Sequence, residues 1–245
     1  MLGRKIIQIE CCDSTNNYIA NLLSDGKIEY GTVILSDEQT RGKGQRGASW
    51  LSNPGENLLF SLYLDTANLS VKHQFILTQY VSISVCHSLE KYGLNPSIKW
   101  PNDILINGKK IAGILIENQL QGNSIVGSIV GIGLNINQLE FSGLNATSLK
   151  LETGSFVSIQ DFVFSLINEL KSFWKIVESE NFELIEKYYF SYLWLLNKEA
   201  VFVDEAGDFI GTIRGVEKNG LLIIERNDQI IRYDLKEIKF PTILL

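Results

Sequence analysis

The sequence predicts an α+β fold followed by a small β domain, and three features of the chain carry this prediction. Strand-like apolar runs and helix-like periodic segments are interleaved up to about residue 196. An Asn107-Gly108 pair between two alternating apolar runs indicates a hairpin. After Asn197 the pattern changes to short strands with glycine-containing turns, which is typical of a small β-barrel. The chain is therefore expected to divide into residues 1–196 and 197–245.

Strands and helices alternate in the first half of the chain. Residues 5–10 read as a strand, and a helix is expected to begin at Ser14 or Thr15, because both are good N-caps ahead of apolar residues at helical spacing. Ordinary capping explains one such side chain, whereas Ser14, Thr15 and Asn16 together leave some groups free for a polar ligand. Two strands are expected at 32–35 and 58–64. The helix expected at 74–92 is apolar around most of its circumference and should be largely buried, with Gly93 at its end.

The second half begins with the hairpin and ends with the β domain. Its strands are expected at 104–106 and 109–117, followed by a longer strand at 124–137. Ser158 and Asp161 open a helix that runs to about residue 178, and a second helix is expected at 182–196. The four short strands of the β domain are expected at 200–203, 209–215, 221–225 and 230–233.

Composition indicates an ordinary globular protein. Of its 245 residues, 45% are hydrophobic and 20% are charged. No apolar run reaches the ~20 residues of a membrane-spanning helix, and the first ten residues show no leader pattern. Three cysteines without CxxC spacing indicate reduced thiols in the cytoplasm. The net charge of -6 argues against a nucleic-acid binder, and two histidines offer little for metal or triad chemistry.

The polar segment from Gln39 to Trp50 is the most unusual stretch. It places three glycines and the cations Arg41, Lys43 and Arg46 between two strands. Glycines let backbone N–H groups converge on an anion, and the cations add charge-assisted hydrogen bonds. A solvated loop is the alternative. The segment is neither a dinucleotide fingerprint, which opens a helix, nor a P-loop, which ends in Gly-Lys-Ser/Thr.

Two strand patterns also point to a ligand site. Lys110 alternates with Ala112, so it is expected to face inward and to need an anionic partner, although a lysine beside a turn is usually solvated. Residues 124–137 carry Gly127, Gly131 and Gly133 on one face, and strand glycines mark the close approach of a ligand or another backbone. This face is expected to be the floor of a pocket, with tight helix packing as the alternative.

Five segments together resemble the biotin–protein ligases, in the order and at the spacings of that family. They are residues 13–16, 41–50, 99–103, 110–115 and 131–137. With the β-rich tail, the resemblance covers essentially the whole chain. It implies a mixed-sheet catalytic domain related to class II tRNA synthetase cores and a C-terminal SH3-like barrel. Some members carry an N-terminal helix-turn-helix and act as repressors; this chain begins at the first strand, resembles the ligase-only form and is not expected to bind operator DNA.

The resemblance implies a reaction in two steps. Biotin's carboxylate attacks the α-phosphorus of ATP in the presence of Mg²⁺ to give biotinyl-5′-AMP, and a lysine of a biotin carboxyl carrier domain then takes the biotinyl group. Two anions must meet, so their charges have to be neutralised, and the mixed anhydride must be shielded from water. The implied partner is thus a carboxylase carrier domain, without nucleic acid or membrane. Whether two copies form a homodimer is left open.

The resemblance also implies roles for individual residues. The residues implied to contact biotin are Ser14, Thr15, Asn16, Gln39 and Gly113. Lys43, Gly44 and Gln45 would fold over the adenylate. Lys110 would act at the carboxylate and α-phosphate, and Asp103 would orient the nucleotide or the acceptor lysine. The residues implied to contact the nucleotide are Arg46, Trp50, Lys99, Asn102 and Asn135. For Trp50, packing in the core is the alternative. No side chain is implied as a metal ligand, because ATP carries the Mg²⁺.

The loop departs from the family pattern, which is usually Gly-Arg-Gly-Arg-Arg-Gly. Here it reads Gly42-Lys43-Gly44-Gln45-Arg46-Gly47. Lysine keeps the charge but loses the bidentate fork, and glutamine loses the charge, which bears on how tightly the intermediate is held.

Two alternatives to a biotin ligase stay open. A lipoate ligase or lipoyl/octanoyl transferase shares the general fold but binds an acyl chain without a ureido head, and a non-catalytic nucleotide-binding regulator would not need both Lys110 and the loop.

Overall fold

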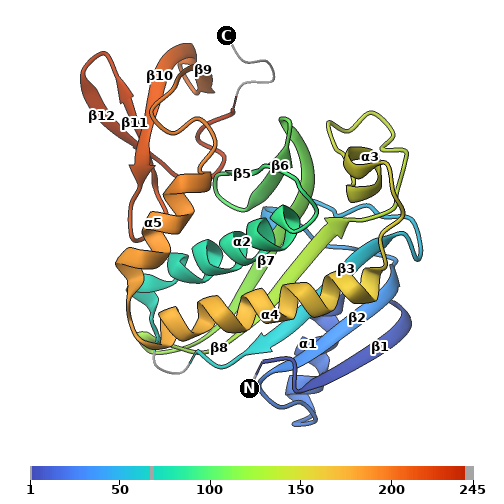
Figure 1. Ribbon diagram of the computed structural model, residues 1–245. Coiled ribbons are helices and arrows are strands. Elements are labelled where there is room, and N and C mark those ends of the chain that lie inside the picture. Colours follow the sequence, from blue (N-terminus) through green and yellow to red (C-terminus); the bar gives the residue numbers. More distant parts are fainter. Residues whose placement is uncertain (1, 67–68, 241–245) are drawn as a thin grey trace.

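A mixed eight-stranded sheet is the centre of the molecule (Figure 1). The computed structural model describes residues 2–66 and 69–240. The strand order is β1-β2-β3-β8-β7-β6-β5, with β4 paired to β8. Only β1 and β2 are parallel among these described pairs. The strands are β1 (Lys5–Cys12), β2 (Thr32–Gln39), β3 (Asn57–Leu64), β4 (Leu69–Ser70), β5 (Pro96–Lys99), β6 (Asp103–Ile106), β7 (Lys109–Gln121) and β8 (Ser124–Asn135).

Helices cover the two faces of this sheet unequally. On the face seen in Figure 1, α2 (Phe75–Glu90) and α4 (Ile159–Glu178) lie across the strands, and α5 (Phe182–Tyr192) packs against α2. Nearly every residue of α2 is buried, as its apolar circumference predicts. The short helix α3 (Leu149–Thr153) follows β8. None of the described helices is long and apolar enough to span a bilayer.

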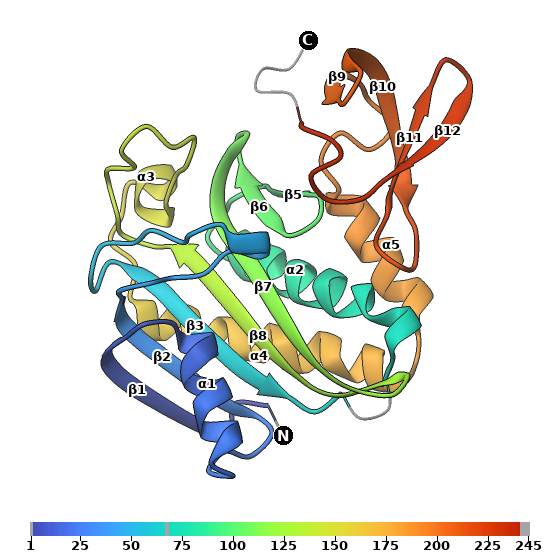
Figure 2. The ribbon, with the colours of Figure 1, turned by 180° about the vertical axis from the view of Figure 1, so that it is seen from behind.

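Of the described α-helices, α1 (Thr15–Ser24) alone lies on the opposite face, where it packs over β2, β3 and β8 (Figure 2). A small apolar cluster, Ile19, Ile34, Tyr63 and Ile129, holds α1 to the sheet. Because one helix covers only part of this face, β7 and β8 remain available to the loop that joins β2 and β3. That loop contains a short 3-10 turn, Gln45–Gly47, and does not open an α-helix, as the sequence predicts.

A second sheet, separate from the first, follows α5. It is antiparallel with the order β12-β11-β10-β9, and its aromatic core includes Phe202, Phe209 and Tyr233. Its strands are β9 (Glu199–Asp204), β10 (Gly207–Val216), β11 (Leu222–Arg226) and β12 (Gln229–Tyr233). The four strands expected from the sequence are therefore confirmed. Residues 241–245 of the expected C-terminal domain lie outside the described residues.

Three ends of elements predicted from the sequence are wrong by four residues. β2, expected to end at residue 35, runs to Gln39, and β7, expected to end at residue 117, runs to Gln121. The helix expected to run to residue 196 ends at Tyr192. The next residues turn back to the large sheet: Leu193 forms a bridge with Ile98, and the Trp194 amide donates to the Ile98 carbonyl at 2.8 Å. Tertiary pairing with β5 thus overrides the local helical pattern.

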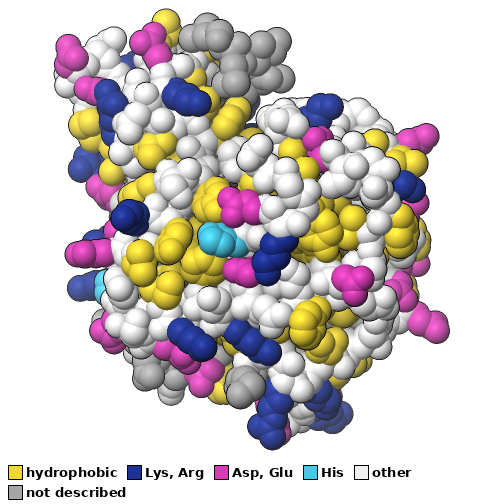
Figure 3. All heavy atoms as spheres, viewed as in Figure 1, with side chains coloured by type: hydrophobic (Ala, Val, Ile, Leu, Met, Phe, Trp, Pro, Cys, Tyr) yellow, Lys and Arg dark blue, Asp and Glu magenta, His cyan; other side chains and the backbone are white. Residues whose placement is uncertain are grey.

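The surface seen in Figure 3 has no single sign of charge. Basic and acidic side chains are interspersed with apolar ones over the helical face. The concentration of positive charge described below lies instead in the cavity on the α1 face.

Candidate active site

A cavity of about 460 Å³ lies on the α1 face of the large sheet. Gly131 and Gly133 of β8 and Gly113 of β7 form its floor. The walls come from the start of α1, residues 43–50, residues 99–103 and residues 235–240. The prediction that the glycine face of β8 floors a pocket is confirmed for Gly131 and Gly133, whereas Gly127 lies against Tyr63 and Gln119 and is not among the described lining residues. Close packing also occurs there, since a Cβ on Gly131 would lie 2.5 Å from Oδ1 of Asn16.

A buried polar cluster occupies the α1 end of the cavity. Ser14, Thr15 and Asn16 each expose only 3% of their surface. The backbone N–H and the hydroxyl of Thr15 both donate to Oε1 of Gln39, at 2.7 and 3.0 Å. Ser14 occupies the N-cap position, but within the described structure its side chain forms no capping hydrogen bond. Its hydroxyl therefore remains available to a ligand.

Two residues that the sequence analysis missed complete this cluster. Ser61 of β3 is fully buried, and its Oγ lies 2.7 Å from Oγ1 of Thr15 and 2.6 Å from Oδ1 of Asn16. The Asn16 amide donates to Oε2 of Glu117 at 2.7 Å. A serine in an otherwise apolar strand was the available signal for Ser61. The cluster thus has its geometry set before any ligand arrives.

A chain of polar contacts connects α1 with the glycine loop. Asn17 donates to Oδ2 of Asp13 at 2.5 Å and accepts a hydrogen bond from Lys43. The hydrogen bond from Asn17, followed by that from the Ser14 amide, holds the pKa of Asp13 below its usual value although burial opposes this. Asp13 lies between β1 and α1, and its carbonyl accepts the Arg41 amide of the loop at 2.9 Å, so its carboxylate is a stable anion beside the loop.

Lys110 and Asp103 form an ion pair of 2.6 Å at the cavity. The pairing meets the expectation that this lysine needs an anionic partner. The expectation that Lys110 shares a face with Ala112 is wrong, because the β6–β7 register shifts by one residue between them. The bulge leaves Ile111 and Ala112 both fully buried and turns Lys110 toward Gly113, where its Nζ would lie 3.3 Å from an added Cβ.

The indole of Trp50 lies directly over the floor. An added Cβ would lie 2.4 Å from its Cε2 at Gly133, so the ring needs glycine there, and 3.1 Å from its Cζ3 at Gly113, which is a tight contact. Nζ of Lys110 lies 5.6 Å from the ring centroid. The Nε1 of Trp50 is buried without a hydrogen-bond partner in the described structure. Trp50 therefore both packs on the sheet and lines the cavity.

Positive charge dominates the charged groups of the cavity. Among its described lining residues, Asp103 is the one carboxylate, whereas the lysines are Lys43, Lys99, Lys110, Lys236 and Lys239. The whole chain carries a net charge of -6, so this concentration of cations is local. A concave site lined by one sign of charge attracts ligands of the opposite sign. Within the described residues there is no cluster of three or more His, Cys, Asp or Glu side chains that could hold a metal ion.

Most residues predicted for the site lie at the cavity, and two do not. Gln39, Gly44, Gln45, Lys99 and Asn102 line it along with the residues above. The buried amide of Asn135 donates instead to the Thr147 carbonyl at 2.9 Å, and Asn135 is not among the described lining residues. Arg46 is not among the described lining residues either; it lines a second groove beside the cavity and contacts Asp234.

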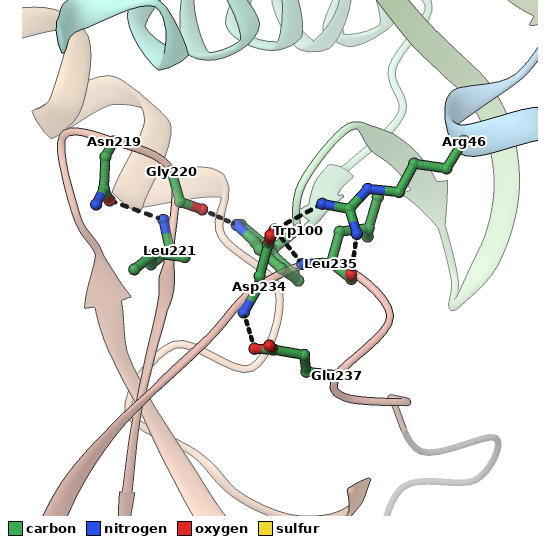
Figure 4. A network of polar contacts seen from close by, with 8 residues as sticks. All are labelled: Arg46, Trp100, Asn219, Gly220, Leu221, Asp234, Leu235 and Glu237. Atoms are coloured by element: carbon green, nitrogen blue, oxygen red, sulfur yellow. Dashed lines mark hydrogen bonds and ion pairs between the residues drawn. The ribbon is translucent and has the colours of Figure 1, made fainter. Parts of the chain in front are cut away.

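The segment after β12 is the largest part of the site that the sequence analysis missed. Leu235, Lys236, Ile238, Lys239 and Phe240 line the cavity. The second sheet is also attached to the rim by Trp100, whose Nε1 donates to the Gly220 carbonyl at 2.9 Å (Figure 4). No local pattern marks this segment as part of a site, because it reaches the cavity only through the packing of the two sheets.

A mixed sheet with a glycine floor, a buried polar cluster and cationic walls defines a protein that binds an anionic small molecule. The model of the biotin/lipoate A/B protein ligase family matches residues 8–135, more than half of the chain, and the chain belongs to this family. The resemblance seen in the sequence is thereby confirmed.

Similar proteins extend this likeness to nearly the whole chain. The bifunctional ligase/repressor BirA of Bacillus subtilis (strain 168) is 29% identical over 237 residues, which are 94% of this chain and 72% of the relative. The biotin–[acetyl-CoA-carboxylase] ligase of Paracoccus denitrificans is 26% identical over 86% of this chain and 90% of its own. The structure of the biotin protein ligase from Aquifex aeolicus in complex with biotin and ATP aligns with a TM-score of 0.81 at 27% identity, over 97% of this chain and 99% of that one.

Proposed function

We propose that this chain is an ATP-dependent biotin–protein ligase. It converts biotin to biotinyl-5′-AMP and transfers the biotinyl group to a lysine of a biotin carboxyl carrier domain. The observation that carries this proposal is the polarity of one continuous cavity: the buried side chains of Ser14, Thr15 and Asn16 lie at the α1 end, and lysines line the remainder. Such a cavity suits a ligand with a neutral polar head and an anionic tail.

The α1 end suits the ureido head of biotin. A ureido group has two N–H donors and one carbonyl acceptor, and the hydroxyls of Ser14 and Thr15 with the side chains of Asn16 and Gln39 supply both kinds of partner. Gly131 lets the Asn16 side chain lie close against the sheet at this end of the cavity. A lipoyl or octanoyl chain offers no hydrogen bond to the buried Ser14 hydroxyl, which forms no capping hydrogen bond in the described structure, and this disfavours such substrates.

Lys110 is assigned to the reacting groups. Its ammonium would neutralise the carboxylate of biotin and the α-phosphate of ATP, so that the two anions can approach, and it would stabilise the charge that develops on the phosphate. Lys99, Lys236 and Lys239 line the rest of the cavity and suit the other phosphates. Mg²⁺ bound to ATP would further neutralise the triphosphate. Pyrophosphate is the leaving group of this step.

The second step needs a neutral amine on the acceptor lysine. Asp103, which holds Lys110 at 2.6 Å, is the one carboxylate among the described cavity residues and is assigned to orient or accept a proton from that amine. Lys43, Gly44 and Gln45 cover the adenylate and limit its exposure to water. Trp50 and Asn102 are assigned to the nucleotide side of the cavity.

The finer architecture is part of the same proposal. We assign residues 1–196 to a catalytic domain related to class II tRNA synthetase cores, and residues 197–245 to an SH3-like barrel. The separate antiparallel sheet of four short strands supports the second assignment. The free thiols of Cys11, Cys12 and Cys86 fit a reducing cytoplasm.

Labelling of a carboxylase carrier domain tests the function. The purified chain, biotin, ATP and Mg²⁺ should add one biotinyl group to the acceptor lysine, with release of pyrophosphate. Parallel reactions with lipoate or octanoate should give far less product. Labelling with lipoate that equals labelling with biotin would overturn the substrate assignment, and nucleotide binding without pyrophosphate release would identify a non-catalytic regulator.

A further inference from the structure

The glycine loop is joined to the segment that follows the second sheet. Nη2 of Arg46 lies 2.8 Å from Oδ1 of Asp234, and Nη1 donates to the Leu235 carbonyl (Figure 4). In return, Nζ of Lys236 donates to the Arg46 carbonyl at 3.3 Å. Arg46 and Asp234 are 188 positions apart in the chain. The two parts of the fold therefore meet at this point beside the cavity.

Arg46 has a backbone conformation that requires external support. Its φ is 50° and its ψ is 41°, in the left-handed region that residues other than glycine rarely adopt. The following residue, Gly47, also has a positive φ of 84°. A strained residue persists only when its surroundings hold it. Here the contacts to Asp234, Leu235 and Lys236 provide that support.

The carboxylate of Asp234 is itself held in position. Its Oδ1 also accepts a hydrogen bond from the Leu235 amide at 2.6 Å, and its own amide donates to Oε2 of Glu237 at 2.6 Å. Exposed ion pairs are usually weak because two mobile side chains must be ordered. The turn at Asp234 has already ordered one of the two partners, so less side-chain entropy is lost when the pair with Arg46 forms.

We propose that Asp234 is a positioning residue that acts through Arg46 to hold the glycine loop closed over the cavity, and that the C-terminal domain thereby retains the acyl-adenylate. The inner side of the same loop, Lys43, Gly44 and Gln45, lines the cavity, so opening at Arg46 uncovers the intermediate. This inference rests on the proposed function for the identity of the intermediate. The closed loop itself requires neither biotin nor ATP.

Trypsin provides a direct test on the free protein. The loop contains Arg41, Lys43 and Arg46 as cleavage sites, and all three are retained in Asp234→Asn. Loss of the charge should speed cleavage in the loop about two- to fivefold, as expected for an exposed ion pair. Raising the salt from about 0.01 to about 1 M should remove the protection of the wild type but change the variant little. Release of biotinyl-5′-AMP should accelerate by a similar factor.

The controls separate charge loss from a specific contact. Glu205→Gln removes a carboxylate from the turn between β9 and β10 and should leave cleavage and release unchanged. The double variant Arg46→Glu with Asp234→Arg exchanges the two charges and should restore protection against trypsin cleavage after Lys43. The same measurement tests the proposal if Asp234→Asn does not fold. Equal cleavage of wild type and a folded Asp234→Asn, or faster cleavage without faster adenylate release, would overturn the proposal. Because cleavage is measured without ligands, a failure of biotin labelling would affect only the proposed function.

Discussion

The ammonium of Lys110 lies 2.6 Å from the carboxylate of Asp103, and the two residues belong to adjacent strands of one hairpin. The turn residues Asn107 and Gly108 both have positive φ, so the hairpin is tight. A bulge follows Lys110, its amide donates to the Asn145 carbonyl, and its carbonyl accepts from the Thr147 amide, which together hold the residue out of the regular alternation. The charge is therefore in place before the substrates bind, which is the arrangement that electrostatic catalysis requires.

Lys110→Ala should abolish most adenylation while leaving the protein folded. Removal of one preorganised charge from a developing anion should lower the rate by on the order of 10²–10³. Biotin-dependent pyrophosphate release measures this step. Lys109→Ala is the matched control, because Lys109 is exposed at the same turn, and it should behave like the wild type. Unchanged pyrophosphate release from a well-folded Lys110→Ala would contradict the assignment.

Ser61→Ala should weaken biotin binding about five- to tenfold, the equivalent of a hydrogen bond of ~1–1.5 kcal/mol. The hydroxyl lies between Thr15 and Asn16, so its loss frees both side chains to turn. Calorimetric titration with biotin checks this. Ser128→Ala removes an equally buried hydroxyl that contacts Asn118 and Thr66, away from the cavity, and should leave the affinity unchanged. Similar affinity losses in both variants would indicate a general effect on the sheet.

Gly133→Ala should lower the affinity for the nucleotide because its Cβ would lie 2.4 Å from Cε2 of Trp50 and displace the ring. The same change should have a much smaller effect in a Trp50→Ala background, where the clash is absent. A double-mutant cycle on ATP affinity measures this coupling, expected at about 0.5–3 kcal/mol for residues in contact. Additive effects would show that Gly133 acts independently of Trp50.

Gln45→Arg should slow the dissociation of biotinyl-5′-AMP and leave the affinity for biotin alone nearly unchanged. Gln45 lines the cavity, and an arginine there adds a charge-assisted contact to the adenylate phosphate, worth about 1.5–3 kcal/mol if desolvated. A pre-formed adenylate complex chased with unlabelled biotin and ATP reports the rate. Thr40→Arg adds the same charge at an exposed position and should not slow release. Equal or faster release from Gln45→Arg would mean that the backbone alone holds the phosphate.

Local patterns in the sequence were sufficient for the elements and for much of the cavity. Alternating glycines in β8 predicted the floor, because any side chain there would collide with Trp50 or Asn16. Asn107-Gly108 predicted the hairpin, because both residues tolerate positive φ. These features depend on neighbouring residues and on backbone preferences, which a single sequence displays directly.

The tertiary structure alone decided the features that join distant segments. The end of α5 at Tyr192 and the contact of Arg46 with Asp234 depend on partners far along the chain, and so do the backbone hydrogen bonds of Lys110 with Asn145 and Thr147. The same holds for the lysines after β12, which reach the cavity because the second sheet packs against its rim. No local periodicity encodes such pairings, since they follow from how whole sheets and helices pack together.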